Sequence, residues 1–337
     1  MKALIIRKPG KAEVDAIPEP VASQENLLLK VRMIGLCGSD LNSFLGKNPL
    51  VTFPRIPGHE VAATVVEGST ENPVLAAGVN VTLSPYTSCG SCSSCLRHRP
   101  NACRFNQTLG IQRDGALTEY IAMPAEKLYA ANLSIKELCL VESLTVGFHA
   151  AARGRVAERD SVAVFGCGGV GLGAIAASHF RGANTIGIDV DDDKLALAKK
   201  AGARHIINTR RESLHQRLLE LTSGLGPDVA IEAIGLPQTF REAVEEIAFA
   251  GRVVYIGYAK EPVAYETRLF VQKELDIMGS RNALPEDFRQ VIRMLEERRF
   301  PVDDAVSSIV PIEEAADVLR AWSDNPAGFS KIMVRLD

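Results

Sequence analysis

The sequence predicts an α/β protein in which a β-rich region is combined with a doubly wound parallel sheet. Three observations support this fold class. Short β-like runs and turns fill residues 1 to about 145, strand-like and helix-like runs alternate from Ser161 onward, and 337 residues suffice for two domains of roughly 100–200 residues each. Strands that alternate with helices imply right-handed βαβ units and a parallel sheet.

The β-rich region begins with a predicted strand at the N-terminus, Met1–Arg7, which has too few apolar residues for a secretory signal. Further strand-like runs cover Leu27–Val31, Val61–Glu67 and Val79–Leu83, and Gly and Pro separate them. This succession of short strands and turns predicts a sheet-based domain.

The alternating region has a strand, then a helix, several times over. The predicted strands are Ser161–Phe165, Thr185–Asp189, His205–Asn208, Val229–Glu232, Arg252–Ile256 and Leu275–Met278, and the predicted helices are Val170–Arg181, Lys194–Ala201, Glu212–Thr222 and Thr239–Ala248. After Gly279 two amphipathic helices, Glu286–Arg299 and Glu313–Ser323, and a strand, Lys331–Leu336, follow. We expect this tail to return to the first domain, which gives residues 1–147 and 279–337 for that domain and 148–278 for the inserted one.

Composition excludes several classes of protein. The net charge is −3, whereas a nucleic-acid or anionic-membrane partner favours a basic surface. No stretch approaches the roughly 18 apolar residues of a membrane span. The prediction is a cytoplasmic protein without a nucleic-acid or membrane partner.

Four of the seven cysteines lie within fifteen residues, in a lobe at 86–105. Cys89, Cys92, Cys95 and Cys103 follow the spacing C-x2-C-x2-C-x7-C. Zinc prefers four thiolates in a tetrahedron, and a closed set of four ligands is structural rather than catalytic. An iron–sulfur cluster is the main rival, since it also uses four cysteines, and buried or free thiols are the alternative without a metal.

A glycine-rich loop follows the predicted strand Ser161–Phe165 and opens a helix. Its sequence, Gly166-Cys167-Gly168-Gly169-Val170-Gly171, fits the dinucleotide-binding pattern in its required context. The glycines let a pyrophosphate approach the backbone at a helix N-terminus, and Val170 lies within the same turn. Asp189 ends the next strand, eighteen residues beyond Gly171, where a carboxylate can accept both ribose hydroxyls. Since no arginine follows directly to neutralise a 2′-phosphate, the loop favours NAD over NADP.

Candidate catalytic residues are scattered along the first domain. Cys37, His59 and Glu142 each allow an ordinary interpretation as a buried thiol, a core imidazole and a helix N-terminal acid. Spacing alone does not bring these three residues together. Their assignment as metal ligands therefore depends on the resemblance of the whole sequence to a known family.

Several motifs in order show that the sequence resembles the zinc-containing medium-chain dehydrogenase/reductase family, in its sorbitol (polyol) and sugar-acid branch. They are Cys37-Gly38-Ser39-Asp40, Gly58-His59-Glu60, the four-cysteine lobe, Asp114-Gly115 with Glu119-Tyr120, Glu142 and the glycine loop. The resemblance covers essentially the whole chain. It implies a GroES-like catalytic domain with an inserted Rossmann domain, and an active site in the cleft between them.

The resemblance also implies roles for individual residues. Cys37, His59 and Glu142 become ligands of a catalytic zinc, with Glu60 as a direct or exchanging ligand and Ser39 passing the proton outward. Asn42 stands where many relatives have histidine, so the proton path can instead run through Ser39, the ribose and water. By the same resemblance, four residues lie near the cofactor or substrate: Gly235, Gly257, Arg281 and Lys331.

These predictions give a zinc-dependent oxidoreductase that binds two zinc ions and NAD. It would oxidise a secondary alcohol, a polyol or a sugar acid, reversibly to a ketone, and Arg281 could bind a substrate carboxylate. The alternatives are a threonine or simple alcohol dehydrogenase of the same family, or a non-catalytic nucleotide-binding protein. The relatives are dimers or tetramers, and a homotetramer is favoured.

Overall fold

The computed structural model describes residues 1–68, 70 and 72–336, and the chain divides into two compact units. The first unit contains Met1–Glu142 together with the segment from Val302 to the end of the described chain, and the second contains Ser143–Pro301. The tail beyond Val302 thus clusters with the N-terminal residues. The domain limits expected from the sequence, at 147/148 and 278/279, differ from these unit limits and remain a prediction.

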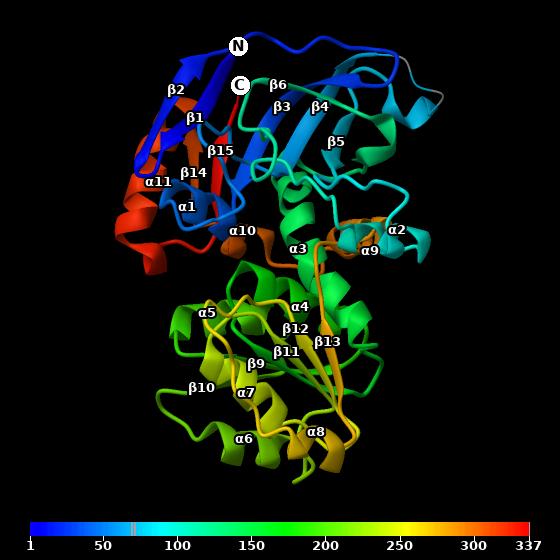
Figure 1. Ribbon diagram of the computed structural model, residues 1–337, viewed down its shortest axis with the longest axis vertical. Helices are drawn as coiled ribbons and strands as arrows, with labels where there is room; N and C mark the ends of the chain where they lie inside the picture. The colour runs from blue at the N-terminus through cyan, green and yellow to red at the C-terminus, as the bar shows by residue number, and fades with distance from the viewer. Residues whose placement is uncertain (69, 71, 337) are drawn as a thin grey trace. The chain divides into compact units, whose positions relative to one another are not determined.

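The first unit is built on a seven-stranded sheet in the order β14-β15-β3-β4-β5-β7, with β6 paired to β3 (Figure 1). All neighbours are antiparallel except β14 and β15. The predicted β-rich region is therefore confirmed. The strands are β3 Leu27–Leu36, β4 Glu60–Glu67, β5 Asn80–Leu83, β6 Tyr120–Met123, β7 Leu128–Ala130, β14 Ser308–Pro311 and β15 Ile332–Arg335.

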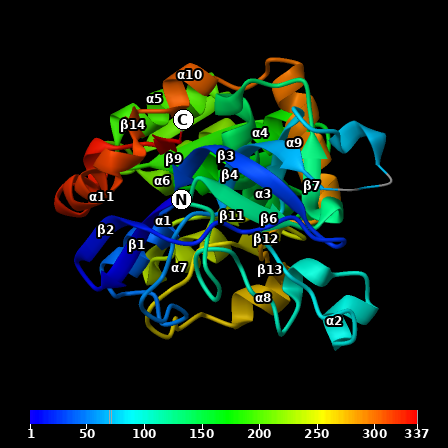
Figure 2. The ribbon, with the colours of Figure 1, turned by 90° about the horizontal axis from the view of Figure 1, so that it is seen from above.

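The core of the first unit lies on the apolar face of this sheet. Along β3, Leu27, Leu29 and Val31 are buried and alternate with partly exposed residues, because successive side chains of a strand point to opposite faces. A separate antiparallel hairpin, β1 (Lys2–Lys8) and β2 (Lys11–Ala16), is covered by α11 (Ala315–Asp324) near the other end of the chain (Figure 2).

Short helices connect the strands of the first unit. They are α1 Gly38–Phe44, α2 Ser93–Leu96, α10 Val302–Ala305, and the 3-10 turns η1 Pro73–Leu75, η2 Pro100–Ala102, η3 Ala125–Lys127, η4 Ile312–Glu314 and η5 Pro326–Gly328. The long helix α3 (Ile135–Arg153) belongs to the first unit up to Glu142 and to the second unit from Ser143.

The second unit contains a six-stranded sheet in the order β10-β9-β8-β11-β12-β13, and all its pairs are parallel. The order runs outward in both directions from the first strand, β8, as in a doubly wound sheet. The strands are β8 Ser161–Phe165, β9 Asn184–Asp189, β10 His205–Asn208, β11 Val229–Glu232, β12 Arg252–Tyr255 and β13 Asp276–Gly279. The predicted Rossmann-type sheet is confirmed.

Helices connect these parallel strands, because such crossovers need a dozen or more residues. They are α4 Gly169–Phe180, α5 Asp192–Lys200, α6 Leu214–Leu221, α7 Pro237–Glu245 and α8 Arg268–Gln272, and α9 Pro285–Glu296 follows the last strand of the sheet. The central strand β11 is buried at every position, as expected for a strand covered on both faces. No helix in the described part of the chain combines the length and apolar character that a membrane span requires.

Candidate functional site

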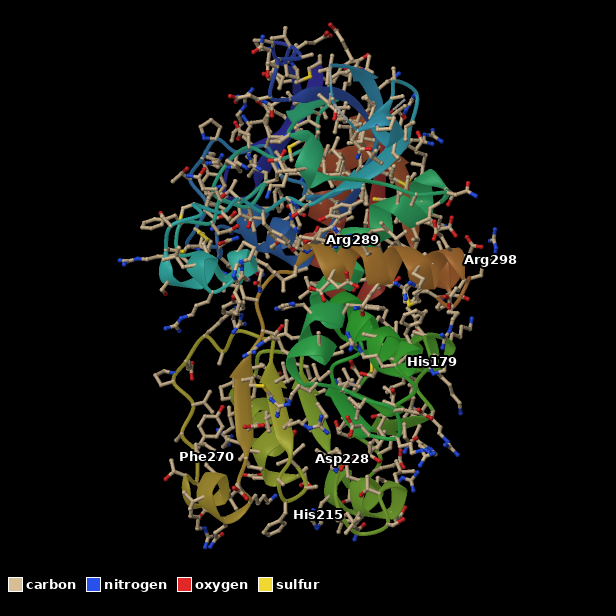
Figure 3. All side chains as sticks on the ribbon, turned by 90° about the vertical axis from the view of Figure 1, so that its right-hand side faces the viewer. His179, His215, Asp228, Phe270, Arg289 and Arg298 are labelled. Atoms are coloured by element: carbon tan, nitrogen blue, oxygen red, sulfur yellow. The ribbon has the colours of Figure 1, made fainter. Side chains whose placement is uncertain are left out.

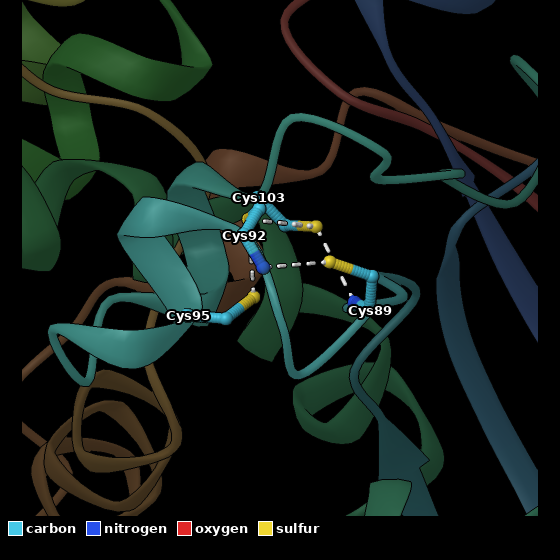
Figure 4. Close-up of side chains that lie close together, drawn as sticks. All are labelled: Cys89, Cys92, Cys95 and Cys103. Carbon is cyan, nitrogen blue, oxygen red and sulfur yellow. Dashed lines mark hydrogen bonds between the residues drawn. The ribbon is translucent and has the colours of Figure 1, made fainter.

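The four predicted zinc cysteines meet in one lobe of the first unit (Figure 4). The ligand atoms of Cys89, Cys92, Cys95 and Cys103 all lie within 4.8 Å of one another. The Cys92 Sγ is 3.5 Å from the Cys95 Sγ and 3.8 Å from the Cys103 Sγ. Four sulfurs bound at about 2.3 Å to one tetrahedral ion lie roughly 3.8 Å apart, so the lobe fits a single zinc ion. An iron–sulfur cluster places several atoms between its thiolates and suits this spacing less well.

Backbone amides of the lobe point at the sulfurs. Cys92 donates its N–H to the Cys89 Sγ at 3.3 Å, Cys89 donates to the Cys103 Sγ at 3.4 Å, and Phe105 donates to the same sulfur at 3.3 Å. The Ser94 hydroxyl and nearby amides lower the pKa of Cys92 to about 5. Since a metal ligand must be a thiolate, these donors favour the ligating state of Cys92, whereas burial raises the pKa of the Cys95 thiol to about 11.

A second group of metal-ligating side chains is assembled from distant segments. The ligand atoms of Cys37, His59 and Glu60 lie within 4.8 Å of one another. Cys37 precedes α1 at the end of β3, and Glu60 begins β4. Because β3 and β4 pair with Gly35 opposite Glu60, the sheet register brings the two motifs to one place.

Asp40 ties these two motifs together. Its buried carboxylate accepts the Cys37 N–H at 2.9 Å and the Gly58 N–H at 3.1 Å, and it lies 3.8 Å from the His59 Nδ1. Burial opposes the charged form of His59, but Asp40, Cys37 and Glu142 together raise its pKa well above the usual value. The surroundings are therefore strongly negative, as a cation site requires.

Lys331 has a partner that the sequence does not reveal. Predicted beside the cofactor pyrophosphate, it is buried in the first unit and donates to both Glu60 carboxylate oxygens at 2.7 Å. Burial opposes its charge, but Glu60 raises the pKa of Lys331 above its usual value. Gly35 leaves room for this pair, since a Cβ there would lie 2.1 Å from the Glu60 Oε2. The structure therefore places Lys331 as the counter-ion of Glu60.

Glu142 is buried in α3 and lies outside the 4.8 Å group. Its carboxylate accepts a short hydrogen bond from the Tyr86 hydroxyl, and burial raises the pKa of both groups. Glu142 also interacts electrostatically with His59 and Glu60. Ser39 lies two residues after Cys37. Its hydroxyl oxygen is buried and has no hydrogen-bond partner among the described residues.

The predicted dinucleotide loop lies at the carboxyl edge of the second unit's sheet. Gly166 follows β8, Gly168 is the N-cap of α4, and Gly169, Val170 and Gly171 form its first turn. A Cβ on Gly171 would lie 1.8 Å from the Gly166 carbonyl oxygen, so only glycine fits there. The exposed amides of this turn suit a pyrophosphate.

Asp189 lies beside this loop at the end of β9. Its Oδ2 accepts the Cys167 N–H at 2.8 Å, and its Oδ1 accepts the amides of Val190 at 2.7 Å and Asp191 at 3.1 Å. Asp191 caps α5, while Asp192 bonds Asn208 and Arg211. Three backbone N–H groups thus hold the carboxylate of Asp189 beside the loop.

Two further predicted glycines meet at the same edge. A Cβ on Gly257 would lie 2.4 Å from the Gly235 nitrogen and also 2.4 Å from the Glu232 Oε2. Glu232 ends β11, and its Oε1 accepts the N–H groups of Ile234 at 2.9 Å and Gly235 at 2.8 Å. Arg281 is exposed in the loop after β13, and its role near cofactor or substrate stays a prediction.

Sequence reasoning gave no role to Asp40, Tyr86 and Glu232. Asp40 belongs to the Cys37-Gly38-Ser39-Asp40 motif. Its role in joining this motif to Gly58 follows only from the folded structure, in which it accepts the Gly58 N–H. Glu232 offered a signal, an acid that ends an apolar strand. Tyr86 offered none, because its partner is 56 residues away.

Two family models match the chain. The alcohol dehydrogenase GroES-like domain matches residues 23–132, and the zinc-binding dehydrogenase domain matches residues 169–297. A zinc-type alcohol dehydrogenase-like protein of Haemophilus influenzae is 34% identical and covers 98% of each chain. This chain belongs to the zinc-dependent alcohol dehydrogenase family. The resemblance inferred from the motifs is confirmed, and the chain is an oxidoreductase of this family.

Other relatives indicate the branch of this zinc-dependent dehydrogenase. It is 27% identical to L-galactonate-5-dehydrogenase of Escherichia coli, over 94% of each chain, and 32% identical to sorbitol dehydrogenase of Bacillus subtilis, over 83% of this chain and 81% of the relative. An Escherichia coli CFT073 crystal structure, described as a short chain alcohol dehydrogenase complexed with NADH, superposes with a TM-score of 0.92 at 27% identity. It covers 100% of this chain and 99% of that one. Zinc and a nicotinamide cofactor are therefore supported for this dehydrogenase.

Proposed function

We propose that this dehydrogenase catalyses the reversible, NAD-linked oxidation of a secondary alcohol, a polyol or a sugar acid, to a ketone. The observation that carries the proposal is the convergence of Cys37, His59 and Glu60 within 4.8 Å in a buried, negatively charged setting. The relatives named for galactonate and sorbitol supply the substrate class.

The donor set fits a catalytic zinc ion. A thiolate, an imidazole and a carboxylate leave a fourth position for substrate. Metal-bound histidines usually donate their other ring N–H to a carboxylate, and the His59 Nδ1 has no bond within the described residues but faces Asp40 at 3.8 Å. Glu60 and Glu142 are both within electrostatic reach, and we propose that one of them completes the set while the other remains in reserve.

Zinc, when bound there, supplies Lewis-acid polarisation of the substrate oxygen. The residues of the chain balance the charge of the ligands and provide a path for the substrate proton. Lys331 neutralises Glu60 and holds its carboxylate, while Tyr86 donates to Glu142 and fixes the second acid. The Ser39 hydroxyl, which lacks a partner in the described chain, is free to accept the alcohol proton and pass it on.

NAD is the proposed cofactor, since the Asp189 carboxylate beside the loop would disfavour a 2′-phosphate. Arg211 is already engaged with Asp192. We propose a second zinc in the four-cysteine lobe, where the N–H groups directed at sulfur favour thiolates. A cytoplasmic homotetramer remains the proposed state. Arg281 keeps a proposed role near cofactor or substrate, whereas Lys331 is assigned to the Glu60 carboxylate in place of the cofactor pyrophosphate.

Metal analysis combined with a substrate panel tests this proposal. We expect two zinc ions per chain and NAD reduction with a polyol such as sorbitol or a sugar acid such as galactonate. Turnover confined to threonine or to simple alcohols would support the alternative substrate classes, and preference for NADP would overturn the cofactor assignment. One zinc ion with no turnover on any alcohol would contradict the proposed function as a whole.

A further inference from the structure

A cavity of about 910 Å³ lies at the amino-terminal edge of the second unit's parallel sheet. It is lined by the first residues of two strands, Ser161 of β8 and Asn184 of β9, and by residues at the ends of α4 and α5. His179, labelled in Figure 3, marks its position at the end of α4. The proposed dinucleotide loop lies at the opposite edge of the same sheet, because Gly166 follows the last residue of β8.

The lining of this cavity is strongly basic. Among the described residues that line it there is no aspartate or glutamate, although the whole chain has net charge −3. Five cationic residues contribute to it: Arg159, Lys199, Lys200, Arg204 and Arg299. Five cations therefore meet at one place of a chain whose net charge is negative.

Helix ends explain only part of this concentration. Basic residues are favoured in the last turn of a helix, where the macrodipole places about half a negative charge. Lys199 and Lys200 occupy that position in α5. The three arginines lie in turns outside the helices, so the helix ends do not account for them.

Acidic partners also leave much of the charge uncompensated. Arg299 is 3.6 Å from Glu297 and lies over the Phe180 ring at 4.8 Å, which fixes its guanidinium. For Arg159, Lys199 and Arg204, no acidic side chain within 4.0 Å is found in the described part of the chain. Lys200 takes part in another interaction, and the inference does not depend on it.

Burial and the positive potential at this edge lower the pKa values of two histidines. Burial and then Arg299 lower the pKa of His179. Burial lowers the pKa of His205 as well, and Arg204 and Lys199 contribute to the shift. Both histidines therefore favour their neutral forms, as expected beside cations that lack full compensation.

We propose that this cavity binds a small phosphorylated anion that carries at least two phosphate charges. Arginine and lysine are the residues that pair with phosphate oxygens, and the volume falls within the range of about 300–1,000 Å³ typical of small-molecule sites. Asn184 adds a carboxamide whose NH₂ group can donate to a phosphate oxygen. Since β8 has five residues at roughly 3.3 Å each, the anion would lie about 15 Å or more from the dinucleotide loop.

Tripolyphosphate titrated calorimetrically into the full-length protein tests this site, with NAD at saturation so that the dinucleotide loop is occupied. We expect binding that weakens with salt, and an affinity roughly tenfold or more lower in Lys199→Gln/Arg204→Gln. The matched control is Arg268→Gln/Arg289→Gln, which removes two exposed cations elsewhere on the second unit and should bind as the unchanged protein does. Circular dichroism checks that each variant is folded.

A second measurement locates the anion. In NMR spectra of ¹³C-histidine-labelled protein, binding should raise the pKa values of His179 and His205 and leave that of His215 unchanged. Three outcomes would overturn the proposal: no binding at millimolar tripolyphosphate, equal binding by the Lys199/Arg204 variant, or binding abolished by NAD. Binding of a poly-glutamate peptide but not of tripolyphosphate would also overturn it, and would indicate an acidic protein partner instead. NAD reduction is not the readout, so this test is independent of the proposed function.

Discussion

Two groups of metal-ligating side chains lie in the first unit, and the chain supplies them in different ways. The cysteine lobe takes four thiolates from fifteen consecutive residues, and its charge is balanced by amides of the same loop. The second group takes a thiol that follows β3 and an imidazole and an acid at the start of β4. The buried Lys331, which precedes β15, balances the charge of Glu60. The comparison teaches that ligands close together in the sequence suit a structural metal site. A site that must leave one ligand position open depends on side chains from distant segments.

The largest expected effect comes from Cys37→Ser. Loss of this thiolate should reduce turnover roughly a thousandfold, since a Lewis-acid metal contributes several kcal/mol to transition-state stabilisation. The fold should survive, because Cys37 is only partly buried and precedes a short helix. Steady-state kinetics and thermal unfolding measure the two effects. Retained turnover in Cys37→Ser would remove Cys37 from the proposed ligands.

Lys331→Met tests the charge balance of the second group. It leaves Glu60 buried without its counter-ion, which should lower the free energy of unfolding by about 3–5 kcal/mol. The stabilisation by Lys331 is fully present below its unfolded-state pKa of about 10.4 and is lost only as the pH rises through the higher folded-state value. Urea unfolding at pH 7 measures the loss.

The double variant Lys331→Met/Glu60→Gln is the matched control for this prediction. It removes both charges, so much of the stability should return. If Lys331→Met unfolds at the same urea concentration as the unchanged protein, the ion pair does not support the site. If the double variant is no more stable than Lys331→Met, lost packing rather than an unpaired charge explains the effect.

Cys92→Ser should have the opposite pattern from Cys37→Ser. One zinc ion per chain should be lost and the lobe destabilised by roughly 3 kcal/mol, since loss of a structural metal is among the larger single-residue effects. Turnover per folded molecule should change little, because the lobe contains no group of the second cluster. Metal analysis and limited proteolysis within residues 86–105 measure the effect. A Cys92→Ser protein that keeps both ions and resists proteolysis would show that the lobe does not depend on zinc.

The same contrast explains what the sequence could predict. Spacing alone indicated the lobe, and the strands Ser161–Phe165, His205–Asn208 and Val229–Glu232 were predicted with the bounds observed. The approach of Glu60 to Lys331 was not predictable, because 271 residues separate them and two strand pairings, β15 with β3 and β3 with β4, bring their segments together. The basic cavity at the sheet edge was not predictable for a similar reason, because its cations come after helices and strands that are far apart in the sequence.

The smallest expected effect concerns Tyr86→Phe, which tests the support given to Glu142. The change removes one hydroxyl donor from a buried carboxylate and leaves the ring in place. Outer-shell partners of metal ligands typically change metal affinity or activity about 10–100-fold, and we expect the lower end, because Glu142 lies outside the 4.8 Å group of Cys37, His59 and Glu60. Zinc affinity measured with a competing chelator gives the size of the effect, and Tyr120→Phe is the control. A change above a hundredfold would make Glu142 the direct ligand and Glu60 the reserve, whereas no change would leave the supporting role to Glu60 and Lys331 alone.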